Sequence, residues 1–177
     1  LDLITTQGGR SDGLDKSYSD GVNQISGTFL DLVDIMQGSN DILYSNTVKG
    51  SCTPNLCQYG NFITNIDDSR TFIRISKRAE DDFATAKVAY DPALEQYRLL
   101  RLLEIKPDTL KAMLDTSLSI LRFTAQAVKS EQNMLDALVA DMETEAGGTS
   151  TTIPTQVTTY QKTLSGYAGS LNSRISG

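Results

Sequence analysis

An apolar seven-residue repeat between residues 108 and 145 is the strongest pattern in this sequence. Two columns of side chains recur at intervals of seven and lie beside each other. The first column is Leu114, Leu121, Val128, Leu135 and Met142, and the second is Leu118, Ala125, Gln132 and Val139. A repeat sustained over about four heptads predicts a long helix that packs side by side with other helices. We interpret Gln132, the polar member of the seam, as a register-setting or partly exposed position; the alternative is a contact with a ligand.

A second stretch of helical spacing begins near Asp12 and ends at Gly50. Its apolar stripe is Tyr18, Val22, Ile25, Phe29, Leu32, Met36 and Leu43. Three glycines, Gly21, Gly27 and Gly38, each weaken such a helix by up to about 1 kcal/mol relative to alanine. Tertiary packing must therefore hold it, and the glycines leave room for a close neighbouring helix. Residues 1–11 are polar and Gly-rich, and we expect them to form a flexible N-terminal segment.

Two more helices complete the pattern. The first runs from Phe62 to the end of an apolar stretch at Ile105, and Asp91-Pro92 within it predicts a kink or a break. The last helix follows a Gly/Thr-rich loop at residues 146–156 and extends to Ile175. No segment alternates apolar and polar residues for long, so strands are not expected. The sequence thus predicts an all-α protein, an elongated antiparallel bundle of about four long helices with one kinked near Pro92, as a single domain over residues 1–177.

The composition excludes several classes of function. The chain has no histidine, so it cannot form a Ser-His-Asp or Cys-His catalytic site or a His-ligated zinc or haem site. Sixteen Lys and Arg residues against twenty-two Asp and Glu give a net charge of −6, which disfavours binding to nucleic acid. No run of eighteen apolar residues occurs, so no membrane span is expected within this chain. We expect no enzyme activity, no cofactor and no metal.

Cys52 and Cys57 enclose a short turn with Pro54-Asn55 at its centre. Such a turn brings the two thiols together, and we expect a disulfide that closes the loop at residues 47–60. Two sulfur ligands alone do not complete a metal site, and two unrelated reduced thiols are the remaining alternative. A disulfide places the protein in an oxidising compartment, so we expect a secreted, periplasmic or extracellular protein. Because the first residue is Leu, we expect a removed leader or an excised domain.

Four cations follow one another on the second predicted helix. Arg70, Arg74 and Arg78 are spaced by four, with Lys77 beside them. Arginine presents a planar fork to carboxylates and phosphates, so these residues are a candidate site for a small anionic ligand. The alternative is a solvated helix face on which Lys77 pairs with Asp81 and Arg78 with Asp82.

The stretch from Leu99 to Ile105 is apolar on nearly every helix face. Its aliphatic residues are Leu99, Leu100, Leu102, Leu103 and Ile105. They are either buried within the monomer or exposed as a patch that contacts another chain. We expect a non-catalytic extracytoplasmic bundle that acts through protein–protein contacts or self-association, as an assembly subunit, adhesin or receptor-binding module. The alternative is a sensor ectodomain in which an anion binds near the arginine stripe and shifts helix packing.

Overall fold

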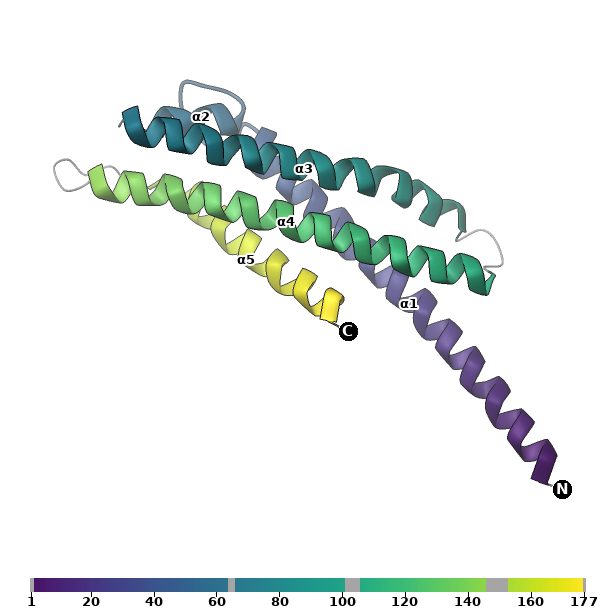
Figure 1. Ribbon diagram of the computed structural model, residues 1–177. Helices are drawn as coiled ribbons and strands as arrows, with labels where there is room; N and C mark the ends of the chain where they lie inside the picture. The colour runs from purple at the N-terminus through teal and green to yellow at the C-terminus, as the bar shows by residue number, and fades with distance from the viewer. Residues whose placement is uncertain (1, 64–65, 101–105, 146–152, 177) are drawn as a thin grey trace.

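Every secondary-structure element of the described chain is a helix. In a computed structural model, which describes residues 2–63, 66–100, 106–145 and 153–176, four long helices and one short helix follow one another (Figure 1). They are α1 (Asp2–Tyr44), α2 (Asn55–Phe62), α3 (Ile66–Leu100), α4 (Pro107–Glu145) and α5 (Thr155–Ser176). The predicted all-α bundle is confirmed.

Helix α4 is the central helix of the bundle. It packs against α1, α3 and α5, whereas the described parts of α3 and α5 do not contact each other. The four long helices alternate in direction, and the N-terminal part of α1 projects beyond the bundle (Figure 1). A proline at the first position of α4 and an acidic residue in its first turn favour helix initiation at Pro107.

Helix α1 differs from its predicted bounds at both ends. It begins at Asp2, so the segment expected to be flexible at residues 1–11 is helical from its second residue onward. No proline precedes Pro54, and the glycines lower helix propensity without breaking the helix. The helix ends at Tyr44 rather than Gly50 because its last carbonyls have side-chain partners. Asn55 Nδ2 donates to the Asp41 carbonyl at 3.0 Å, and the Tyr59 hydroxyl donates to the Ile42 carbonyl at 2.9 Å.

The predicted disulfide between Cys52 and Cys57 is confirmed, with the Cα atoms 5.7 Å apart. The loop that contains it is shorter than expected, because α2 begins at Asn55 within residues 47–60. Asn55 is buried, and its Oδ1 also accepts a hydrogen bond from the Val48 amide at 2.9 Å. One side chain therefore joins the end of α1, the loop and the start of α2.

Helix α3 continues through Pro92 without a break. A proline inside a helix leaves the carbonyl four residues earlier without its donor, which here is the carbonyl of Val88. Both Val88 and Pro92 are exposed, so water can satisfy that carbonyl. Of the loop predicted at residues 146–156, positions 146–152 lie outside the described residues, and α5 begins at Thr155.

The buried face of α4 is wider than the predicted seam. The first heptad column is buried from Leu121 to Met142, as expected. The second column is only half-buried, and a different column with the same spacing takes its place in the interior. That column is Leu110, Ser117, Thr124, Glu131 and Leu138. Three of these five residues are polar, so apolar periodicity alone could not identify the column.

Glu131 is the most unusual residue of this interior. Its side chain is 0% exposed, and neither carboxyl oxygen has a hydrogen-bond partner of normal geometry among the described residues. Ser39 of α1 faces it, and Tyr44, Tyr59 and Tyr167 lie close enough to feel its charge. Burial raises the pKa of Glu131, and the Ser39 hydroxyl lowers it by a smaller amount, so that the pKa is about 8. The carboxyl group is therefore mostly protonated at neutral pH.

Two of the glycines of α1, Gly27 and Gly38, admit α5 as a close neighbour, whereas Gly21 faces Leu110 of α4. A Cβ at Gly38 would overlap the hydroxyl of Tyr167, and one at Gly27 would come within 2.8 Å of the Arg174 guanidinium. Both α5 side chains also bind α1. The Tyr167 hydroxyl donates to the Asp34 carbonyl at 3.3 Å, and Arg174 Nε donates to Asp31 Oδ2 at 2.7 Å. The missing side chains thus set the approach of α5 to α1.

The raised pKa of Glu131 predicts that stability falls with rising pH. The folded chain keeps this proton between pH 4.5 and about 8, whereas the unfolded chain has lost it. The free energy of unfolding should therefore fall by about 1.4 kcal/mol per pH unit across this window. Glu131→Gln has no proton to lose and should remove this slope. Urea unfolding from pH 4.5 to 8.5 should show variant and wild type converging at the acid end, with the variant more stable at the alkaline end. Parallel curves would contradict the assignment.

The α1–α5 approach predicts opposite effects for two glycine substitutions. Gly38→Ala should lower the free energy of unfolding by about 1 to 2 kcal/mol, because the Tyr167 ring must move away from α1. Gly169→Ala is the matched control, since a Cβ there meets nothing within 4 Å. It should raise stability by up to about 1 kcal/mol through helix propensity. Equal changes in urea unfolding for the two variants would refute the close approach.

Candidate functional site

Two of the four cations expected at an anion site face the same groove. Arg74 and Arg78 of α3 line a groove of about 500 Å³ between α3 and α4. Arg70 is exposed and does not line it, and Lys77 is turned to a different partner, with its Nζ 2.7 Å from Asp81 Oδ1. Of the four predicted cations, Arg74 and Arg78 therefore line the groove, whereas Arg70 and Lys77 do not.

Helix α4 supplies the other wall of this groove. Its residues there are Gln126, Lys129, Ser130 and Asn133, and Ile75 of α3 adds an apolar contact. The spacing of three or four residues places Gln126, Lys129 and Asn133 on the exposed strip of α4, and Ser130 is buried at the edge of that strip, against α3. The groove thus combines three cations, two amides and a hydroxyl. We call it the α3/α4 groove.

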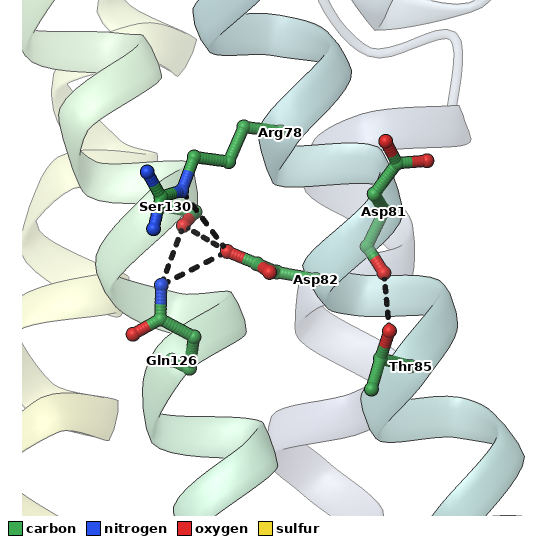
Figure 2. A network of polar contacts seen from close by, with 6 residues as sticks. All are labelled: Arg78, Asp81, Asp82, Thr85, Gln126 and Ser130. Atoms are coloured by element: carbon green, nitrogen blue, oxygen red, sulfur yellow. Dashed lines mark hydrogen bonds and ion pairs between the residues drawn. The ribbon is translucent and has the colours of Figure 1, made fainter.

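Asp82 is the carboxylate beside this groove, and it is bound to both helices (Figure 2). Its Oδ2 accepts hydrogen bonds from the Ser130 hydroxyl at 2.5 Å and from Gln126 Nε2 at 3.0 Å. Arg78 Nε lies 3.6 Å from the same oxygen. Burial on its own would raise the pKa of Asp82, but these hydrogen bonds and the charge of Arg78 together lower it. The carboxylate therefore stays ionised and fixes α3 against α4.

The two ion pairs of the solvated-face interpretation are both present, but they leave other cations unpaired. Lys77–Asp81 is fully on the surface, whereas Asp82 is only 24% exposed. No carboxylate among the described residues lies within ion-pair distance of Arg74 or Lys129. Unpaired cations at the mouth of a groove attract an anion, and an arginine there can bind it in bidentate geometry.

A second groove lies on the other side of α4, against α5. We call this space of about 420 Å³ the α4/α5 groove, and it shares Gln126 and Lys129 with the first. Its remaining lining residues are Arg122, Ala125, Gln132, Ala168, Asn172 and Ile175. Gln132, which the heptad pattern places in the seam, is half-buried at this groove, in agreement with a partly exposed position.

Only part of the predicted apolar contact patch falls on described residues. Leu99 is 62% exposed, and Leu100 is half-buried. Both line a groove of about 320 Å³ together with Ala112 and Met113 of α4. Leu102, Leu103 and Ile105 lie outside the described residues. Partner binding by this patch stays a prediction.

Neither a metal centre nor a membrane span occurs in the described ranges. Within them, no three His, Cys, Asp or Glu side chains are grouped closely enough to hold a metal ion. None of the described helices combines the length and apolar character that crossing a lipid bilayer requires.

The sequence did not identify the α4 side of the groove. Lys129 and Asn133 lie on the polar side of the strongest heptad helix, where polar residues are expected on any bundle. The available signal was the absence of an acidic residue three or four positions from Lys129, since positions 125, 126, 132 and 133 are Ala, Gln, Gln and Asn. Comparison with protein-family models, with curated proteins and with solved structures gives no match.

The bonds of Asp82 predict a pH-dependent contribution to stability. Its lowered pKa means that this contribution is present above the pKa of the unfolded chain and is lost as the pH falls through the folded pKa. Asp82→Asn should therefore lower the free energy of unfolding at pH 7 by about 1 to 2 kcal/mol. The difference from wild type should shrink at pH 3.

Asp81→Asn is the matched control for this prediction. The Asp81 side chain is 62% exposed, and exposed pairs contribute little, so urea unfolding should change by less than about 0.5 kcal/mol. Similar losses for the two variants at pH 7 would show that Asp82 has no special role in joining α3 to α4.

Proposed function

We propose that this protein is a non-catalytic helical bundle that acts by binding, and that the α3/α4 groove holds an anionic group of its partner. One observation carries the proposal. Arg74, Arg78 and Lys129 line one groove, and two of the three have no acidic partner among the described residues. A carboxylate or phosphate there would form charge-assisted hydrogen bonds with these cations.

The partner that we favour is another protein chain. Long helices present extended faces, and the exposed Leu99 gives a second, apolar contact point at the end of α3. Leu99 and Leu100 together with Leu102, Leu103 and Ile105 make up the proposed contact patch. The protein would then serve as an assembly subunit, adhesin or receptor-binding module, with a different protein or a second copy as partner.

A sensor for a small anion is the second candidate. The groove lies at the junction of α3 and α4, where Arg78 already shares Asp82 with Ser130 of the facing helix. A bound anion would compete with Asp82 for Arg78 and would alter the bonds between the two helices. The observation that favours a sensor over a passive scaffold is that Arg78 of α3 and Ser130 of α4 share the carboxylate of Asp82.

We place this function outside the cytoplasm. The disulfide between Cys52 and Cys57 supports an oxidising compartment, because reducing conditions in the cytosol keep most thiols free. We therefore propose a secreted, periplasmic or extracellular protein.

Anion binding predicts thermal stabilisation that depends on the groove cations. Inorganic phosphate or citrate at ten times its dissociation constant should add about 1.4 kcal/mol to the free energy of unfolding. For a chain of this size that is a rise in melting temperature of about 3 to 6 °C. The double variant Arg74→Gln/Lys129→Gln should lose this rise. Differential scanning calorimetry at matched ionic strength measures it.

Arg98→Gln/Lys111→Gln is the control, since it removes the same charge from two exposed ion pairs away from the groove. This variant should keep the rise seen for the wild type. If both double variants respond to the anions as the wild type does, the groove is not the binding site.

A further inference from the structure

The two grooves on either side of α4 form one surface. They share Gln126 and Lys129, which lie between α3 on one side and α5 on the other. Arg122, Gln126, Lys129 and Asn133 follow one another at intervals of four, three and four, which places them on one strip of α4. With packed helices about 8 to 10 Å apart, the surface from α3 to α5 is about 16 to 20 Å wide. An extended chain crosses that width with about five or six residues.

Positive charge extends across the whole width of this surface. Arg74 and Arg78 lie on the α3 side, Lys129 in the middle and Arg122 on the α5 side. Like Arg74 and Lys129, Arg122 has no carboxylate within ion-pair distance among the described residues. A small anion would neutralise one or two of these cations. A ligand with several separated negative charges would neutralise all three unpaired cations and would share Arg78 with Asp82.

The uncharged lining residues match a polypeptide. Side-chain amides each offer a donor and an acceptor, the two groups that a peptide bond needs, and Gln132, Asn133 and Asn172 provide them here. Ile75, Ala125, Ala168 and Ile175 add apolar contacts for aliphatic side chains. None of the residues lining either groove is aromatic, so nucleobases would find no ring to stack on.

We propose, building on the proposed function, that an extended acidic polypeptide segment lies across α4 and occupies both grooves at once. Its carboxylates pair with Arg74 and Arg78 in one groove, with Lys129 on the ridge between them and with Arg122 in the other groove. Its aliphatic residues contact the apolar lining. The affinity then comes from both sides of α4, and a partner that fills only the α3/α4 groove binds less tightly.

A peptide-binding measurement with one variant on each side of α4 tests this inference. The probe is a fluorescein-labelled octapeptide of alternating Glu and Val, and the reference is the same peptide with Gln in place of Glu. Fluorescence anisotropy at low salt should give at least tenfold tighter binding of the acidic peptide. Arg74→Gln and Arg122→Gln should each weaken it about fivefold or more, whereas Arg98→Gln should leave it unchanged. All three side chains are exposed, so circular dichroism should report intact folds.

Three outcomes would overturn the inference; the first two leave the proposed function standing, and the third leaves standing only an anionic group in the α3/α4 groove. In the first, Arg74→Gln weakens the peptide and Arg122→Gln does not, so the ligand stays within the α3/α4 groove. In the second, succinate displaces the labelled peptide at the same concentration as the unlabelled octapeptide does, so a small diacid is sufficient for binding. In the third, an oligothymidylate of equal charge binds more tightly than the peptide, so the partner is a nucleic acid. Binding of neither peptide nor small anions overturns both proposals.

Amide spectra provide a readout that needs no variant. Adding the acidic peptide to isotope-labelled protein should shift the side-chain amide signals of Asn133 in the first groove and of Asn172 in the second, at the same peptide concentration. Shifts confined to Asn133 contradict an occupant that spans α4.

Discussion

The bundle depends on α4 packing against three helices at once. Its inner face contacts α1, and its two flanks contact α3 and α5, which do not contact each other in the described chain. A helix in this position has only one strip left for solvent, and a groove borders that strip on each side. The candidate binding surface is therefore a direct consequence of the packing. The same central position explains why Asp82 of α3 reaches Ser130 and Gln126, which stand at the edge of that strip (Figure 2).

The interior against α1 is polar where a bundle is usually most apolar. Ser117, Thr124 and Glu131 occupy successive heptad positions on α4 and are buried there. Thr124 donates to the sulfur of Met36 at 3.8 Å, whereas Ser117 and Glu131 have no hydrogen-bond partner of normal geometry in the described chain. Burial of an ionised carboxylate without a partner costs several kcal/mol, so the proton on Glu131 is part of the folded state. A buried polar group without a hydrogen-bond partner costs free energy, so this column lowers the stability of the bundle and the rest of the core must offset it.

The sequence predicted the helices better than it predicted their packing. Periodicity, prolines and the absence of alternation were sufficient for four long helices, and the Cys52–Cys57 turn was sufficient for the disulfide. Helix α1 ended earlier than expected because Asn55 and Tyr59 bind its last carbonyls, and these contacts depend on how the chain folds back. The interior column of α4 was missed because serine, threonine and glutamate are typical of surfaces. The same limit applies to the site, since Arg74 and Lys129 meet only when α3 and α4 pack in one particular register.

The pattern of ion pairs explains why the cations of this surface are unpaired in an acidic protein. Most pairs on the described helices are local, with partners three or four residues apart, as for Lys87–Asp91 and Lys111–Asp115. Around Arg122 the residues at those distances are Leu118, Ser119, Ala125 and Gln126. Arg74 and Lys129 also lack an acidic residue at every such position. Neighbouring residues on their own helices therefore do not neutralise their charge, and no other carboxylate of the described chain lies within ion-pair distance of them. The fold thus leaves positive charge unpaired in the grooves on both sides of α4. A partner that supplies its own carboxylates can pair with this charge.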